Sequence, residues 1–224
     1  MSNILIDQYR FTSGGGGGGI ALVNTLTQGS SNGNGFTTSN VNISGANFIV
    51  LSISYLDFGT AATVSDSSSN TWNGLTIRSS GSDRSRLYYA YNATCTSTHN
   101  FTVTGSGTYA SIAVLAFSGV RSASTPFDAE SGAVTGSGNN TSQPGSITPA
   151  SANSLFVTGL KEAKEFPTVS APFSTVYGTT DDGSNHSGAF IAYEIQTTAT
   201  ARNPTWSWTS TTNPFSMAAV FKAP

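Results

Sequence analysis

The sequence has few charged residues. Only 9 Lys or Arg and 11 Asp or Glu occur among 224 residues, so charged residues make up 9% of the chain, whereas soluble globular proteins carry about 25%. A chain with so few cations does not suit a phosphate backbone, and we expect no nucleic-acid partner. Few ionisable groups also leave few candidate acids, bases and nucleophiles, so we expect neither an enzyme nor a bound cofactor.

Cysteine and long apolar runs are scarce as well. Cys95 is the single cysteine, which excludes an internal disulfide and a metal site built on cysteines. The opening residues hold only Ile4–Ile6 as an apolar run, which is shorter than the apolar stretch of a secretory signal. The longest apolar run, Ile112–Phe117, is far shorter than the roughly 20 residues that cross a membrane. We therefore expect neither export through a signal peptide nor insertion into a membrane.

The sequence does contain a short segment of polar and apolar residues, a run of glycines, and a long segment in which short apolar runs alternate with small polar residues. Residues 1–19 predict an extended N-terminal arm, in which the six consecutive glycines Gly14–Gly19 form a flexible linker. Apolar side chains at intervals along the arm are its expected contacts with a partner. These residues are Ile4, Ile6, Tyr9 and Phe11.

From Ile20 to Pro224, short apolar or alternating runs are separated by Gly, Ser, Asn and Thr. This pattern predicts an all-β fold, an antiparallel two-sheet sandwich of jelly-roll type that occupies residues 20–224. Helix-like sequence is confined to Leu160–Glu165, which is too short to be stable alone, and no segment repeats with a fixed period. The stronger predicted strands are Phe48–Leu56, Leu87–Tyr91, Phe101–Thr104, Tyr109–Phe117, Ser154–Leu160, Ala189–Ile195, Thr205–Thr209 and Phe215–Lys222, and the weaker ones are Ile20–Thr25, Ala62–Asp66, Leu75–Arg78 and Ser174–Tyr177.

Three patterns have the spacing of catalytic or cofactor motifs. Gly14–Gly19 matches the dinucleotide pattern GxGxxG, but no βαβ unit follows it, so we interpret it as a linker. Gly29–Gly33 matches the GxSxG of a nucleophile elbow, but it lies in a polar segment without a following helix, and a turn is the better interpretation. Asp128 and Glu130 share a face of an extended strand, as paired carboxylates of a glycoside hydrolase must, although surface positions are the favoured interpretation.

Two acidic loops match calcium loops only in part. The loop that begins at Asp66 has oxygen-bearing side chains at its first, third and fifth positions, but it lacks Gly at the sixth and Glu at the twelfth. Asp181 and Asp182 precede a glycine, which is a strong turn signal. We therefore predict two turns and no metal site, and leave calcium binding by either loop open.

Trp206 and Trp208 alternate along one predicted strand and therefore share a face. Large aromatic side chains dominate protein cores, so core positions are the favoured interpretation. A glycan contact is the alternative, in which the two rings form a sugar-stacking platform together with Trp72 and the tyrosines Tyr88, Tyr89 and Tyr91. A subunit contact is the third.

Several phrases follow one another in order from Phe48 to Ala223. They are VSDSSSNTWNGLT, RLYYAYNAT, ASIAVLAFSGV, TPFDAES, NSLFVTGL, AFIAYEIQTT, PTWSWT and MAAVFKA. This succession resembles a β-sandwich domain found in virion proteins of tailed bacteriophages and in some bacterial surface proteins, although typical members have Gly where this chain has Ser69. The opening phrase NILIDQYRF, followed by glycines, is similar to the start of phage structural proteins. The resemblance rests on strand patterns, and it implies no catalytic residues in this chain.

The resemblance implies a virion structural protein, most simply a capsid decoration (cement) protein, which assembles in the host cytoplasm and needs no signal peptide. Its partners are then the major capsid protein or other virion subunits and further copies of itself, with a trimer as one option. Residues 1–19 lie along neighbouring subunits in this hypothesis. The alternatives are a tail-fibre or receptor-binding module that binds a glycan through exposed Trp or Tyr, and a glycan hydrolase that uses Asp128 or Glu130.

Overall fold

A computed structural model describes residues 19–29, 35–56, 62–105, 109–135, 138–162, 165–173, 176–179 and 188–224. The named elements in these ranges are all strands, and no described segment forms a helix long and apolar enough to cross a membrane. The strands are β1 (Ala21–Gly29), β2 (Phe36–Thr37), β3 (Phe48–Leu56), β4 (Thr63–Asp66), β5 (Asn73–Gly74), β6 (Arg78–Ser80), β7 (Asp83–Tyr91), β8 (Phe101–Thr104), β9 (Ala110–Ser118), β10 (Phe127–Val134), β11 (Asn139–Ser142), β12 (Ser154–Glu162), β13 (Thr168–Val169), β14 (Val176–Thr179), β15 (Gly188–Gln196), β16 (Trp206–Thr212) and β17 (Phe215–Phe221).

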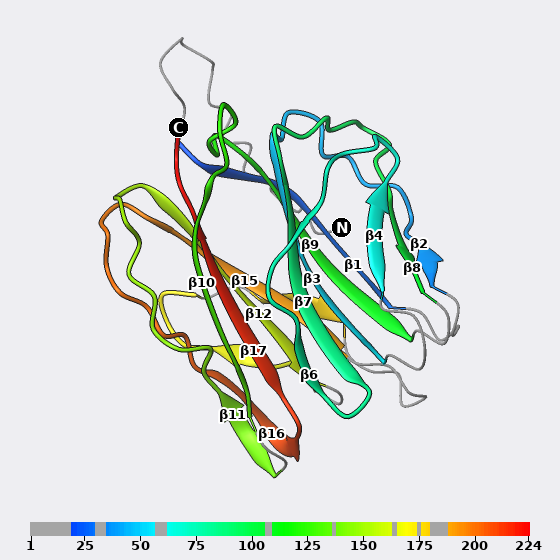
Figure 1. Cartoon of the computed structure of the whole chain (residues 1–224), viewed down its shortest axis with the longest axis vertical. Coiled ribbons are helices and arrows are strands. Elements are labelled where there is room, and N and C mark those ends of the chain that lie inside the picture. Colours follow the sequence, from blue (N-terminus) through cyan, green and yellow to red (C-terminus); the bar gives the residue numbers. More distant parts are fainter. Residues whose placement is uncertain are drawn as a thin grey trace, which may run out of the picture.

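The described strands form four antiparallel sheets. Two large sheets lie in the centre of the molecule, with the strand orders β1-β9-β3-β7-β5, where β6 also pairs with β7, and β10-β17-β12-β15-β14. We call them the first and the second central sheet. The small sheet β2-β8-β4 lies beside the first central sheet and the small sheet β11-β16-β13 beside the second (Figure 1). The strands are therefore stacked in four layers.

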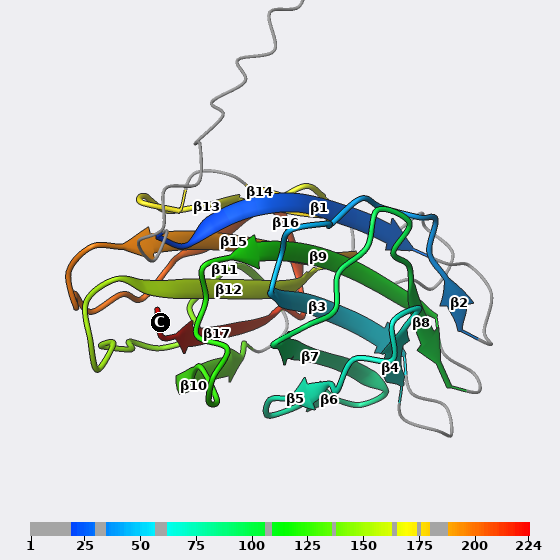
Figure 2. The ribbon, with the colours of Figure 1, turned by 90° about the horizontal axis from the view of Figure 1, so that it is seen from above.

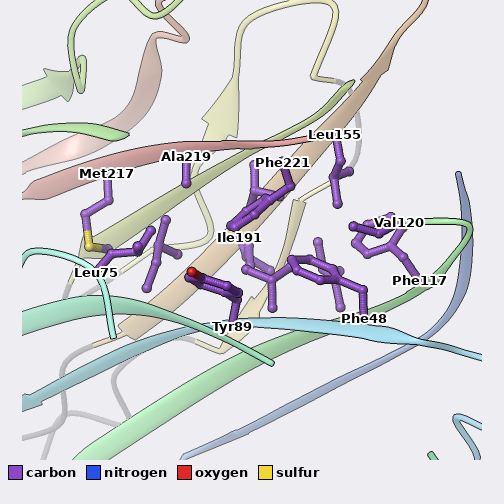
Figure 3. Packing of buried hydrophobic residues seen from close by; sticks show 14 of the residues in the cluster. Phe48, Leu75, Tyr89, Phe117, Val120, Leu155, Ile191, Met217, Ala219 and Phe221 are labelled. Carbon is purple, nitrogen blue, oxygen red and sulfur yellow. The ribbon is translucent and has the colours of Figure 1, made fainter. Parts of the chain in front are cut away.

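The inner faces of the two central sheets pack against each other. Side chains alternate between the two faces of a strand, so Phe48 and Val50 of β3 point to the same core as Leu155 and Val157 of β12, and all four are fully buried. Aromatic rings fill much of this core, and the ring centroids of Phe48 and Phe221 lie 4.7 Å apart (Figure 3). Burial of this apolar surface is the main force that holds the two halves of the chain together.

The outer faces of the central sheets are buried as well. Ile49 and Leu51 of β3 belong to a second core together with Phe101 of β8. Phe156 of β12 belongs to a third core together with Trp206 of β16. Strands that are covered on both faces carry continuous apolar runs rather than alternating ones, which explains the sequences of β3, β9 and β17.

The first half of the chain (residues 19–120) and the second half (residues 127–224) have the same strand order. The row β1-β9-β3-β7 corresponds to β10-β17-β12-β15, and the small sheet β2-β8-β4 corresponds to β11-β16-β13. In both halves the first strand pairs with the last one. The predicted segment 20–224 therefore contains one architecture twice.

The registers of the two halves agree in detail. β1 has a register shift directly after Leu22, which lies opposite Phe117, and β10 has one directly after Phe127, which lies opposite Phe221. A bulge at the same position of both first strands supports their equivalence, since bulges are specific features of a strand. The pairing registers make four pairs of positions equivalent: Phe48 and Leu155, Ser52 and Gly159, Tyr91 and Ile195, and Phe117 and Phe221. Phe101 and Trp206 are equivalent as the first residues of β8 and β16.

An approximate two-fold axis relates the two halves. β3 packs on its own equivalent β12, while β9 faces β15 as β7 faces β17, and β1 faces β14 as β6 faces β10 (Figure 2). Each contact thus occurs twice with the roles of the halves exchanged. This is the geometry of an isologous dimer interface, here formed within one chain.

The structure confirms the predicted all-β antiparallel sandwich and differs from the prediction in two details. The described strands form four sheets rather than two, because small sheets cover the outer faces of the central ones. The helix-like segment Leu160–Glu165 begins as the end of β12, where Leu160, Lys161 and Glu162 pair with β15. The side chains of Lys161 and Glu162 are buried there, so tertiary pairing overrides the local helix propensity.

Candidate functional site

The two tryptophans of β16 are core residues. Trp206 is 0% exposed and Trp208 is 7% exposed, and the indole N–H of Trp206 donates a 2.9 Å hydrogen bond to Oγ1 of Thr158 inside the second half. Neither side chain offers a ring face to solvent, and stacking of a sugar requires such a face. The glycan contact considered for Trp206 and Trp208 is therefore set aside, and burial favours the core interpretation.

The carboxylates Asp128 and Glu130 hold parts of the fold together. Asp128 Oδ2 accepts a hydrogen bond from the backbone N–H of Ala150 at 2.7 Å, and its Oδ1 lies 3.3 Å from Nζ of Lys222. Both oxygens of Glu130 bind Thr76, at 2.9 Å from its backbone N and 2.7 Å from its hydroxyl, so this side chain ties the second half to the first. Asp128 also sits at the bulge of β10, where the simple alternation assumed from the sequence breaks down.

Asp66 organises the turn that follows β4. Its Oδ1 accepts hydrogen bonds from the backbone N–H groups of Ser68 at 2.8 Å and Asn70 at 3.2 Å, and its Oδ2 accepts one from the indole N–H of Trp72 at 2.9 Å. Nε2 of the buried His99 lies 3.8 Å from the same Oδ2. The side chain thus supplies the acceptors for the turn backbone, as in an Asx turn.

The same contacts determine the charge of Asp66. Burial raises the pKa of the carboxyl, but the nearby His99 side chain and the hydrogen bonds from the backbone N–H groups of Asn70 and Ser68 outweigh burial, so its pKa lies below the ordinary 3.8. Both carboxylate oxygens face protein donors. Among the described residues, no three His, Cys, Asp or Glu gather into a group that could hold a metal ion. The geometry favours the turn interpretation for this loop.

Several predicted residues lie outside the described ranges. They include the arm with Ile4, Ile6, Tyr9 and Phe11, and the acidic turn with Asp181 and Asp182. Partner binding by the arm and the role of the acidic turn stay predictions.

A polar hollow lies beside the short edge strand β5. It has a volume of about 390 Å³ and its lining combines Tyr91 with hydroxyl and amide side chains, among them Ser69, Thr71, Asn73 and Asn92. None of its lining residues carries a charge. This composition suits an uncharged ligand that has many hydroxyl groups of its own.

A second hollow adjoins the first, since Asn73 lines both. It has a volume of about 590 Å³ and is lined by Trp72, Tyr89 and Phe127 together with Arg86, Glu130 and the backbone of β5. The Arg86 guanidinium binds the carbonyl oxygens of Gly74 and Leu75. Its charge is therefore engaged by carbonyl oxygens in β5 and directly after it.

Sequence reasoning placed Trp72 and Tyr91 among the candidate sugar-stacking residues but missed the polar residues around them. Asn73 and Asn92 belong to segments about twenty residues apart, and only the pairing of β5 with β7 brings them together. The sequence does offer one signal, since Tyr91 ends a predicted strand and Asn92 begins the loop after it. The segment that pairs with this strand and completes the hollow cannot be identified from local sequence.

Comparison with known proteins identifies no relative of this chain. No family model, no curated protein and no solved structure matches the chain. The function is therefore inferred from the residues and their geometry.

Proposed function

We propose that this chain is a structural protein of a tailed-bacteriophage virion, most simply a capsid decoration protein that binds the shell through the arm of residues 1–19. The observation that carries the proposal is where its few charges lie. Several charged side chains that the structure describes bind other parts of the same fold, and most of the exposed residues are Ser, Thr, Asn, Gly or Ala. Such a surface has little like-charge repulsion, which suits dense packing beside neighbouring copies.

Two ion pairs illustrate this use of charge. Nζ of Lys161 in β12 lies 3.1 Å from Oδ1 of Asp83 in β7, so the pair joins the two halves. Arg202 binds Glu194 through two contacts of 2.7 Å, one to each carboxylate oxygen, which is the bidentate geometry that Arg favours. Side chains held in this way support the architecture and are not free to act on a substrate.

The proposal includes the type of sandwich. In the first half, the larger sheet contains the order β1-β9-β3 and the small sheet the order β2-β8-β4. The second half repeats this arrangement with β10-β17-β12 and β11-β16-β13. We infer from this order that each half is of jelly-roll type, with its fifth strand paired to the larger sheet. Two rigid sandwiches side by side then form the body from which the arm extends to a neighbour.

The test is co-sedimentation of the purified full-length chain with capsid shells that lack it. We expect the chain to pellet with the shells, and a variant in which Ile4, Ile6, Tyr9 and Phe11 are all changed to Ser to stay in the supernatant, because apolar anchors of the arm supply the affinity. Asn92→Gly is the matched control and should pellet normally. Pelleting of the arm variant would refute binding through the arm.

A tail-fibre or receptor-binding module is the second candidate, and the two hollows beside β5 favour it. The two functions differ in where the protein sits on the virion. Immunogold labelling of intact virions separates them, because a decoration protein labels the shell and a receptor-binding module labels the tail. Label on neither would contradict both candidates.

A further inference from the structure

We propose that the two hollows beside β5 form one groove that binds a neutral oligosaccharide, and we call it the β5 groove. The segments Ser68–Asn73 and Tyr91–Thr94 supply the lining of its first hollow, and Asn73 is shared with the second hollow. The inference goes beyond the virion role, because it assigns a ligand and a site that capsid binding through the arm does not need.

Unpaired polar groups line the first hollow. Within the described structure, the hydroxyls of Ser69 and Thr71 and the side-chain amide of Asn92 make no hydrogen bond to protein, and all three residues are exposed. An amide offers both donors and an acceptor, and a hydroxyl offers one of each kind. Sugar hydroxyl groups need this mixture, because each of them also donates and accepts.

Each of the two hollows has an aromatic residue in its lining. Trp72 and Tyr91 are half-buried, Trp72 in the second hollow and Tyr91 in the first. The indole of Trp72 is held by its hydrogen bond to Asp66 and by an edge contact with Phe101, with ring centroids 6.1 Å apart. A fixed, partly exposed ring gives an apolar platform for the C–H face of a sugar without loss of side-chain freedom on binding.

The loops that carry these groups are fixed before any ligand arrives. Asn70 binds the backbone of Thr94 twice, as acceptor from its N–H at 2.8 Å and as donor to its carbonyl at 3.0 Å. Ser69 and Asn92 have φ angles of 56° and 50°, the left-handed region that non-glycine residues seldom adopt. Strained positions of this kind persist where the surrounding structure holds them, and they gather at binding sites.

Charge determines the class of ligand. The first hollow has no charged side chain, and in the second hollow Arg86 is bound to the backbone of β5 and Glu130 to Thr76. An anionic ligand such as nucleic acid would need free cations. The volumes of the two hollows, about 390 and 590 Å³, lie in the usual range for small-molecule sites, about 300–1,000 Å³. A neutral oligosaccharide meets both conditions.

The test is a glycan array of neutral and acidic oligosaccharides probed with the labelled full-length chain, followed by calorimetric titration with the strongest neutral ligand. Tyr91→Ala removes a platform and should weaken binding at least tenfold. Asn92→Gly removes the free amide at a backbone conformation that glycine adopts readily, and should weaken binding several-fold. Ile195→Ala is the matched control, because Ile195 occupies the position equivalent to Tyr91 in the second half, and should bind like the parent chain.

Each outcome bears on the proposal. Absence of any bound glycan on the array, exclusive binding of acidic glycans, or equal affinities of the parent chain and Asn92→Gly would overturn it. Thermal unfolding of each variant shows whether it is folded. If Tyr91→Ala does not fold, Asn92→Gly still tests the proposal. A chain that pellets with shells but binds no glycan refutes this inference alone, so the virion proposal is judged separately.

Discussion

The two halves of the molecule share a strand order and differ at their edges. Position by position, the cores keep large apolar side chains, as with Phe101 in the first half and Trp206 in the second. The edges diverge, since the first half has the polar β5 groove, whereas the second has an apolar hollow beside β13, where Phe166 is 56% exposed. Core positions are thus constrained by packing while edge positions are free to acquire separate roles.

The largest expected effect comes from the equivalent core positions. Trp206→Ala and Phe101→Ala should each lower the free energy of unfolding by about 3–5 kcal/mol, because each leaves a cavity in a buried cluster. Trp206→Phe, which introduces the side chain of the first half, should cost less. Urea unfolding followed by circular dichroism measures all three. A loss below about 1 kcal/mol for Trp206→Ala would show that this ring does not support the core as described.

A smaller effect is expected where the halves meet at the approximate two-fold axis. A Cβ at Gly159 would lie 3.0 Å from Oγ of Ser52 and 3.0 Å from Cδ2 of Leu87, so Gly159→Val should cost about 1–3 kcal/mol through overpacking. Ser52→Ala is the matched control at the equivalent position. Its hydroxyl is buried without a partner among the described residues, so the change should be neutral or stabilising. Equal losses in the two variants, measured by thermal unfolding, would contradict close packing at this axis.

The smallest effect concerns pH. The folded-state pKa of Asp66 lies below 3.8, so the unfolded chain takes up this proton at higher pH than the folded one. Asp66 therefore stabilises the fold above about pH 4, and this contribution disappears as the pH falls through the lowered folded-state pKa. Asp66→Asn should flatten the dependence of stability on pH in this acidic window. Urea unfolding at a series of pH values measures it.

A carboxylate of the second half provides the control for this titration. Hydrogen bonds from the side chains of Ser210 and Thr209 and from the backbone of Thr209 lower the pKa of Glu165 to about 2. Because Glu165 is only partly buried, whereas the side chain of Asp66 is fully buried, solvent screens the contacts of Glu165 more, and Glu165→Gln should flatten the curve less than Asp66→Asn does. The reverse order would contradict the description of Asp66 as the anchor of its turn.

Much of the fold could be predicted from the sequence, because strand periodicity is local. The runs predicted at Phe48–Leu56, Tyr109–Phe117 and Ala189–Ile195 coincide with β3, β9 and β15 within one or two residues. The internal duplication could not be predicted. Equivalent strands such as HNFTVT and PTWSWT share the alternation of buried residues but few identities, since a core position requires volume and apolarity rather than one residue type.

The candidate site was harder to predict than the fold. Trp72 and Tyr91 attract notice as aromatic residues, but whether a ring is buried depends on the layer that covers it. The same holds for Trp206, which is buried between β16 and the second central sheet. The groove needs the pairing of Asn73 with Tyr89 across β5 and β7, and the two segments are separated by a turn and β6. Such distant pairings are set by tertiary structure, so local patterns carry little information about them.

The central position of the last strand in each half has a consequence for synthesis of the chain. β9 lies between β1 and β3, and β17 lies between β10 and β12, so neither large sheet can close until its final strand has left the ribosome. The first sandwich can assemble while the second is still being translated. The common core of the two halves is complete only when β17 is in place, because Met217, Ala219 and Phe221 belong to it, so a stop before Phe215 deprives both halves of this strand.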